Sequence, residues 1–366
     1  MTSTGPLDRL KRRIALSGPI TVAEYMAEVL THPSQGYYST RDPFGAAGDF
    51  VTAPEISQMF GELIGLWCAE AWQRLGMPDP VVLAELGPGR GTLMSDALRA
   101  AGMLPGFRDA LRLHLVELSP ALRARQRDTL RDVDVIWHAE VAELPETPVL
   151  AIANEFFDAL PIRQFEKTPR GWCERMVGYD PDADRLAFAL AAPGPQAEAY
   201  VPEALRGAET GAVVEISPAA ISVMHELARR VATHGGAVLA VDYGRAAPAA
   251  EPTLQAVQRH RRADVLDTPG EADLTAHVDF PTLVRAAREA GAEVHGPVGQ
   301  GDFLLGLGLR QRADILKANA SPRQRNDIDE AVKRLTAPQQ MGRLFKALAV
   351  VPPGFGVPAG FPQEDA

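Results

Sequence analysis

Three features of the sequence predict an α/β fold built around a mostly parallel sheet. Short apolar runs alternate with longer runs of helical periodicity, the apolar runs lack polar alternation, and several of them end in glycine-rich or acidic turns. A strand inside a parallel sheet is covered on both faces, which explains why it is apolar throughout. The expected strands are 81–86, 111–118, 133–137, 149–153 and 237–241, and the expected helices are 92–101, 120–130, 218–233 and 280–290.

The region before the first of these strands is expected to be helical and to cover a ligand pocket. It spans residues 1–80. A threonine followed three residues later by a glutamate is a capping-box pattern, and it predicts helix starts at Thr21–Glu24 and Thr52–Glu55. Between these two starts, residues 41–50 predict a glycine-rich loop.

The core of the fold is expected to be interrupted once. Short strands joined by turns predict an antiparallel β insert over 161–212. The core then comprises residues 81–160 and 213–311.

The last part of the chain combines strand-like and helical patterns. The runs 293–295 and 303–309 are compatible with an antiparallel hairpin at the sheet edge. Residues 312–366 are expected to form a helical tail that becomes loose beyond residue 352, where Pro and Gly accumulate.

Composition and charge narrow the classes of function. Of the 366 residues, 46% are apolar and 23% are charged, which is typical of a globular protein. The formal net charge of −10 disfavours a nucleic-acid partner, because phosphate binding needs clustered Lys and Arg. Cys68 and Cys173 have no partner at metal-ligand spacing, so no metal site is expected. The N-terminus does not resemble a secretory signal and no long apolar run occurs, which predicts a cytoplasmic protein without membrane insertion.

The most informative motif follows the first expected strand. Glu85, Gly87, Gly89 and Gly91 form the pattern E-x-G-x-G-x-G between an apolar strand and a helix. Glycines in such a turn let the backbone approach a ligand and leave N–H groups free to bind it. The spacing differs from the G-x-G-x-x-G of dinucleotide folds, and the lysine of a Walker loop is absent. A tight turn that serves packing alone is the alternative interpretation.

Three polar residues after the next two strands extend the predicted nucleoside site. Glu117 ends the second expected strand, where a carboxylate can accept hydrogen bonds from both ribose hydroxyls. Ser119 follows it, either at the ligand or as a helix N-cap. Glu140 follows the third strand, where it is either a partner of the adenine amino group or a solvated surface acid. These residues indicate a nucleoside but do not choose among nucleoside cofactors.

The turn after the fourth expected strand carries the candidate catalytic residues. Asn154, Glu155 and Asp158 follow that strand directly. Carboxylates can hold a guanidinium through paired hydrogen bonds and concentrate its nucleophilicity on one nitrogen. Glu155 fits this role and Asp158 is a second acid, although Asn154 and Asp158 would also suit a turn without chemistry. Asp242, at the end of the fifth strand, is weaker evidence for the same edge.

Eight segments spread along the chain carry a resemblance to a known family. They are GPITVAEYMAEVLTHPSQGYY (18–38), GDFVTAPEISQMFGE (48–62), ELGPGRGTLM (85–94), LVELSP (115–120), NEFFDALPIRQF (154–165), GGAVLAVDYG (235–244), VLDTPGEADLTAHVDF (265–280) and MGRLFK (341–346). In this order they resemble the MidA-like family of class I S-adenosylmethionine-dependent methyltransferases.

The resemblance implies a Rossmann-like methyltransferase sheet and S-adenosylmethionine as the cofactor. Gly87, Gly89 and Gly91 would bind that cofactor, Glu117 would hold its ribose, and segment 49–57 would pack over the pocket. The mitochondrial members of the family imply a protein substrate that presents an arginine. A subunit of respiratory complex I is one candidate for that substrate.

Three functions stay open at this point. The first is a protein arginine methyltransferase, the second a small-molecule methyltransferase, and the third a non-catalytic assembly factor that keeps the cofactor site. A hydride-transfer oxidoreductase is disfavoured by the glycine spacing. The sequence is compatible with a homo-oligomer and does not decide the oligomeric state.

Overall fold

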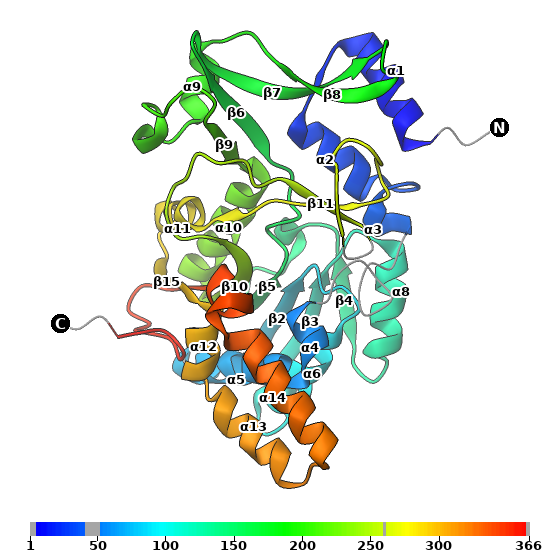
Figure 1. Ribbon diagram of the computed structural model, residues 1–366. Coiled ribbons are helices and arrows are strands. Elements are labelled where there is room, and N and C mark those ends of the chain that lie inside the picture. Colours follow the sequence, from blue (N-terminus) through cyan, green and yellow to red (C-terminus); the bar gives the residue numbers. More distant parts are fainter. Residues whose placement is uncertain (1–4, 41–51, 259–260, 364–366) are drawn as a thin grey trace.

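The computed structural model describes residues 5–40, 52–258 and 261–363. The central sheet contains parallel strands β2 (Val81–Leu86), β3 (Leu111–Val116), β4 (Val135–His138), β5 (Val149–Asn154), β10 (Gly236–Arg245) and β14 (Val278–Asp279), and antiparallel strands β15 (Glu293–Gly299) and β16 (Phe345–Val351). Their order is β15-β16-β10-β5-β2-β3-β4, with β14 beside β10 (Figure 1). The predicted α/β fold with a mostly parallel sheet is confirmed, and the five expected strands from 81–86 to 237–241 are present.

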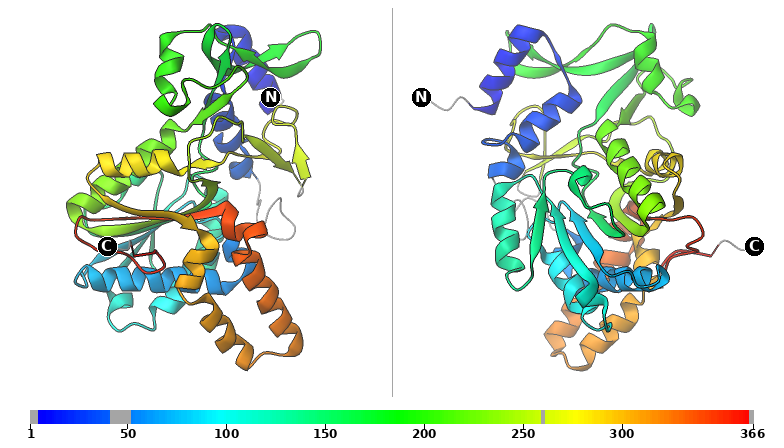
Figure 2. Two further views of the ribbon diagram at one scale, coloured as in Figure 1. Left: turned by 60° about the vertical axis from the view of Figure 1, so that its left-hand side comes forward. Right: turned by 180° about the vertical axis from the view of Figure 1, so that it is seen from behind.

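Helices cover both faces of this sheet, as a parallel sheet requires. On one face lie α5 (Gln58–Arg74) and α6 (Thr92–Ala101), and on the other lie α10 (Pro218–His234) and α11 (Phe280–Glu289) (Figures 1 and 2). Successive residues of β2 alternate between the two clusters: Leu83 packs with the first pair of helices, and Val82 and Ala84 pack with the second. Both faces of each central strand are therefore buried, which accounts for the continuous apolar runs.

The β insert forms a second, five-stranded sheet at one end of the molecule. It contains β6 (Arg163–Thr168), β7 (Gly171–Asp180), β8 (Arg185–Leu190), β9 (Val213–Ile216) and the short N-terminal strand β1 (Ile20–Thr21). Its pairings are antiparallel, and β9 adds to β6. The helices α1 (Pro6–Ser17) and α2 (Val22–Thr31) lie beside this sheet (Figures 1 and 2).

A small three-stranded sheet lies between the insert and the central sheet. It is built from β11 (Gln255–Gln258), β12 (Arg261–Ala263) and β13 (Asp273–Thr275). The remaining elements are α3 (Tyr37–Thr40), α4 (Ala53–Ile56), α7 (Phe107–Ala110), α8 (Pro120–Thr129), η1 (Val141–Glu143), α9 (Pro195–Tyr200), η2 (Glu203–Leu205), α12 (Gln300–Gly306), α13 (Leu309–Ala318), α14 (Pro322–Thr336) and η3 (Pro338–Gly342). None of the helices in the described ranges combines the length and apolar character that crossing a membrane requires.

The expected edge hairpin was wrong in its second strand. Residues 303–309 fall in α12 and the start of α13, and β15 pairs instead with β16. The run F-L-L-G-L-G-L lacks polar alternation, so it suits a buried helix as well as a strand, and Phe303 and Leu304 are fully buried in helical form. The sheet edge is completed by β16, which is buried from Ala347 to Val351 and also pairs with β10.

The prediction of a loose tail beyond residue 352 was also wrong for the described residues. Phe361 is buried, and its ring lies 5.2 Å from the ring of Phe303. The carbonyl of Val357 accepts a hydrogen bond of 2.8 Å from Arg74 on α5. One contact between aromatic rings and one hydrogen bond therefore hold this Pro/Gly-rich segment against the core.

One of the two expected capping boxes is present. Thr21 Oγ1 accepts a hydrogen bond from the Glu24 backbone, and the Glu24 carboxylate accepts one from the Thr21 backbone. Thr52 precedes α4 but its side chain makes no capping hydrogen bond, and the next helix, α5, is capped by Ser57. Glu55 accepts a hydrogen bond of 3.0 Å from Thr92 Oγ1 on α6. The glycine-rich loop expected over 41–50 lies outside the described residues.

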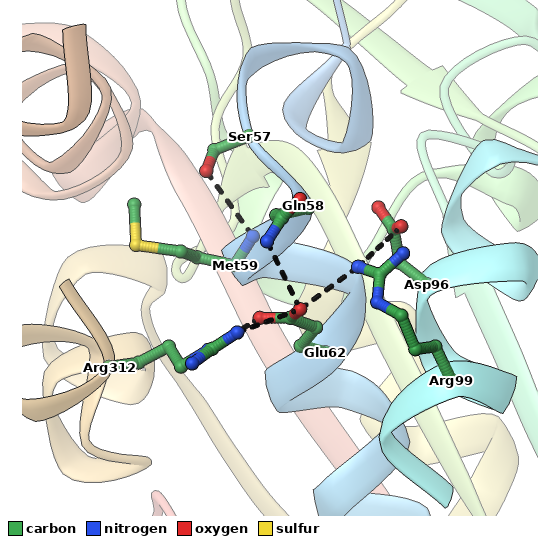
Figure 3. Close-up of polar contacts among 7 residues, drawn as sticks. All are labelled: Ser57, Gln58, Met59, Glu62, Asp96, Arg99 and Arg312. Carbon is green, nitrogen blue, oxygen red and sulfur yellow. Dashed lines mark hydrogen bonds and ion pairs between the residues drawn. The ribbon is translucent and has the colours of Figure 1, made fainter. Parts of the chain in front are cut away.

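Glu62 on α5 joins three helices through one buried carboxylate. It accepts hydrogen bonds from Arg312 of α13 at 2.7 Å and from Arg99 of α6 at 2.9 Å, and Gln58 adds a third donor (Figure 3). Burial alone would raise the pKa of Glu62, but the hydrogen bonds and charges of Arg312 and Arg99 outweigh burial and lower it. The C-terminal helices are thus tied to the helix layer that supports the central sheet.

Glu62→Gln is expected to destabilise the protein by about 1–3 kcal/mol at neutral pH, because two guanidinium groups lose their shared charge partner. The difference from the wild type should shrink as the pH falls through the lowered pKa of Glu62, since both chains then carry a neutral side chain there. Urea unfolding at several pH values measures both effects, with the exposed Glu330→Gln on α14 as the matched control. Equal midpoints for the two variants would contradict this role.

Candidate active site

A cavity of about 1000 Å³ opens at the carboxyl ends of the parallel strands. Its wall includes residues that directly follow β2, β3 and β5, because the carboxyl ends of parallel strands meet at one edge of the sheet. The described lining residues include eight acids and a single basic residue, Arg90; the acids are Glu55, Glu85, Glu117, Glu140, Glu155, Asp158, Glu226 and Asp273. The cavity is therefore suited to ligands that carry positive charge.

The glycine turn after β2 forms one wall of the cavity. Gly87, Gly89 and Gly91 have φ values of 61°, 53° and 82°, a left-handed conformation that side chains disfavour. Gly87 and Gly89 line the cavity, whereas Gly91 begins α6 and faces the side chains of Thr129 and Leu130. Gly91 thus sets the direction of the chain, and the two other glycines leave backbone next to the open space.

Glu85 lies at the end of β2, beneath this turn. It lines the cavity although its exposed fraction is only 3%. Burial raises the pKa of Glu85 to about 8, and its Oε2 accepts no hydrogen bond from the described residues. A buried acceptor without a donor is costly, so a ligand that brings an N–H group would satisfy it.

Glu117 is fixed at the end of β3 by two donors. Its Oε1 accepts a hydrogen bond of 2.7 Å from the Ser119 backbone, and its Oε2 accepts one of 3.2 Å from the Gln126 side chain. Gln126 is fully buried and also donates to the carbonyl of Gly89, at 2.8 Å. Its own oxygen accepts a hydrogen bond from the Trp137 ring. Gln126 therefore couples the glycine turn to Glu117, a role that no spacing rule predicted.

Ser119 and Glu140 occupy the same part of the wall. Ser119 lines the cavity and is also an N-cap, because its hydroxyl accepts a hydrogen bond from Leu122 and donates one to the carbonyl of Tyr38. Glu140 lines the cavity while remaining exposed. Both residues therefore line the cavity; Ser119 also caps a helix, and Glu140 is also an exposed acid.

The turn after β5 brings Asn154, Glu155 and Asp158 to the cavity together. Glu155 has a φ of 49°, which is uncommon for a residue with a side chain. Its Oε1 accepts hydrogen bonds from the Ala53 backbone at 3.0 Å and from the Asn154 amide at 3.3 Å, and its Oε2 accepts none from the described residues. Burial raises the pKa of Glu155 to about 7.

Asp242 of β10 holds this turn from behind. It is fully buried, and its Oδ2 accepts hydrogen bonds from the backbone N–H groups of Phe156, Phe157 and Asp158 at 3.1, 2.9 and 3.3 Å. It is not among the lining residues of the cavity. The sequence placed Asp242 at the pocket edge, whereas the structure makes it a support for the residues that line the pocket.

The opposite wall comes from parts of the chain that were not singled out as site residues. Tyr38 donates a hydrogen bond of 2.7 Å to Asp273 of β13, and the Tyr243 hydroxyl lies between Gln255 and Thr275. These residues line the cavity. Tyr38, Tyr243, Asp273 and Thr275 fall within the segments that carry the family resemblance, whereas no signal in the sequence pointed to Gln255.

Comparisons with known proteins agree with this geometry. Residues 63–298 match a family described as "Putative S-adenosyl-L-methionine-dependent methyltransferase". The chain is 40% identical over 375 residues to "Protein arginine methyltransferase NDUFAF7, mitochondrial" of Mus musculus, with 95% of this chain and 85% of that protein covered. The human protein of the same name is 39% identical, with 95% and 84% covered. These relatives are named as mitochondrial, so the expectation of a cytoplasmic protein is wrong.

A solved structure shares the whole fold. A Burkholderia thailandensis protein, crystallised with S-adenosyl-homocysteine, superposes with a TM-score of 0.83 and 32% identity. The match covers 97% of this chain and 93% of the other. A second structure from the same organism gives a TM-score of 0.82 and also 32% identity.

The cavity of this chain has the features that S-adenosylmethionine requires. The open acceptor of Glu85 suits an ammonium group, the buried Asn154 Oδ1 is a second acceptor without a partner among the described residues, and the exposed backbone at Gly87 allows close approach. The residues present therefore fit this cofactor. By fold, site and sequence, the chain belongs to the family of S-adenosylmethionine-dependent methyltransferases whose model it matches.

Proposed function

We propose that this methyltransferase modifies an arginine side chain of a protein partner. The observation that carries the proposal is the Glu155 carboxylate, which is anchored through one oxygen and open through the other in a cavity rich in acids. The names of the similar mouse and human proteins support the same substrate class. A subunit of respiratory complex I is the first substrate to test, because the family resemblance implies it.

In this proposal the cofactor occupies the half of the cavity next to β2 and β3. Glu85 would receive the ammonium group, Gly87 and Gly89 would contact the methionyl part, and Glu117 would accept the ribose hydroxyls. Ser119 and Glu140 would border the nucleoside. When bound, S-adenosylmethionine supplies a methyl group activated by a sulfonium centre.

The other half of the cavity would receive the guanidinium. An ionised Glu155 can accept an N–H of the substrate through Oε2, while Ala53 and Asn154 keep the carboxylate from rotating. Asp158 adds negative charge on the same turn, which favours a cation there. The carboxylate holds the delocalised cation in one orientation, so that one nitrogen is presented for methylation and the proton that this nitrogen loses can pass to Glu155.

Glu155→Gln should lower kcat by at least about 100-fold, because the neutral amide cannot orient or polarise a guanidinium as a carboxylate does. The affinity for S-adenosyl-homocysteine, which lacks the sulfonium charge, should change by less than about threefold, since Glu155 is assigned to the substrate. Transfer of a labelled methyl group to protein substrates measures the first quantity and calorimetry the second. The exposed Glu203→Gln in η2 is the matched control, and normal turnover in Glu155→Gln would remove Glu155 from the mechanism.

The pH dependence of kcat/KM should report the ionisation of Glu155. Its pKa in the free protein is raised to about 7, and only the carboxylate can hold the cation, so kcat/KM should rise with pH up to that value and level off above it. Below the pKa the expected slope is about tenfold per pH unit. Initial rates with both S-adenosylmethionine and peptide subsaturating, so that the free protein is the reference state, test this, and a flat profile across neutral pH would contradict the assignment.

Asp242→Asn should reduce turnover without abolishing cofactor binding. The amide has one oxygen and brings N–H donors toward the N–H groups of Phe156, Phe157 and Asp158, so the turn that carries Glu155 should shift. We expect kcat to fall by about 10- to 100-fold and the cofactor Kd to stay within about threefold. Asp128→Asn, an exposed change on α8, serves as the control. Equal losses in cofactor affinity and turnover would indicate general unfolding and not a positioning role.

A further inference from the structure

Several acids at the carboxyl ends of β5 and β10 lie close enough for their charges to affect one another. Glu155 and Asp158 lie on the turn after β5, Asp242 lies on β10, and Asp273 faces them from β13. Arg334 of α14 is the positive charge that acts on Glu155. On the side of α4, Ala53 supplies a backbone donor and Glu55 adds another acid to the wall.

So many neighbouring carboxyl groups, several of them buried, cannot all be ionised before a cation binds. Burial raises the pKa of Asp158 well above its ordinary value, and the charges of Asp242, Asp273 and Glu155 raise it further. The pKa of Glu155 is also raised, mainly by burial. Part of the cluster therefore carries protons at neutral pH until a cation enters.

The two forms of the cofactor differ by one charge at sulfur. S-adenosylmethionine carries a sulfonium, and S-adenosyl-homocysteine carries a neutral thioether, because the methyl group leaves without the electron pair of the broken bond. The ammonium and carboxylate groups are the same in both. Any difference in how the acidic wall responds to the two ligands must therefore come from the sulfonium.

We propose that the acidic turn of Glu155 and Asp158 selects the cofactor over its product by charge, releasing a proton when the sulfonium binds and recovering one once the neutral thioether remains. The inference rests on the cofactor assignment and not on arginine as the substrate. Its consequence is that the product loses an electrostatic contribution to binding as soon as the methyl group has left. Turnover would then be helped by weaker retention of the product.

The linkage can be made quantitative for Glu155. If it is ionised with S-adenosylmethionine bound and keeps a pKa of about 7 with the product bound, the ratio of the two affinities should increase about tenfold between about pH 6 and about pH 8. At neutral pH the cofactor should release roughly half a proton more than the product does.

Titration calorimetry of the full chain with each ligand, in two buffers of different ionisation enthalpy, counts these protons directly. We expect a larger release with S-adenosylmethionine, a smaller difference in Glu155→Gln and Asp158→Asn, and an unchanged difference in Glu203→Gln. Thermal melting shows whether each variant is folded, and two independent acid variants keep the test open if one is not. Equal proton release and a constant affinity ratio would overturn the proposal while leaving the cofactor assignment in place. Failure of both ligands to bind would overturn both.

Discussion

The carboxylate of Asp242 takes hydrogen bonds from three consecutive backbone N–H groups of the turn after β5, and the geometry of the site depends on this contact. These N–H groups would otherwise be buried without acceptors, which a folded protein rarely tolerates. The contact stabilises a turn in which Glu155 adopts a left-handed conformation that its side chain disfavours. The contact between β10 and the turn after β5 thereby offsets the cost of this conformation and places the acids at the edge where the cavity opens.

The same edge of the sheet supports two parts of the cavity wall. Gln126 connects the glycine turn to Glu117, and Asp242 connects β10 to the turn of Glu155, so each half has its own buried support. Neither support residue is among those that line the cavity. Glu117 and the turn that carries Glu155 are therefore held in place by buried hydrogen bonds.

The fold could be predicted where burial on two faces leaves a local mark in the sequence. Continuous apolar runs at 81–86 and 149–153 indicated buried parallel strands, and both are present as β2 and β5. The pattern failed at 303–309, because an apolar run with small residues suits a buried helix equally well and only pairing with distant strands decides. The strand β16 completes the edge from far along the chain, and no local signal shows that register.

The site divides in the same way. Glu85, the glycines, Glu117 and the acids after β5 follow strands directly, so topology brings them together once a parallel sheet is assumed. Gln126 and the wall at Asp273 depend on tertiary contacts over long separations, and the supporting role of Asp242 depends on backbone geometry.

The most direct test of the site is a crystal structure of this chain with S-adenosyl-homocysteine. We expect this structure to show the amino group at Glu85, the ribose at Glu117 and the sulfur facing Glu155 and Asn154. A ligand bound outside this cavity, or with its sulfur turned away from the turn after β5, would contradict this expectation.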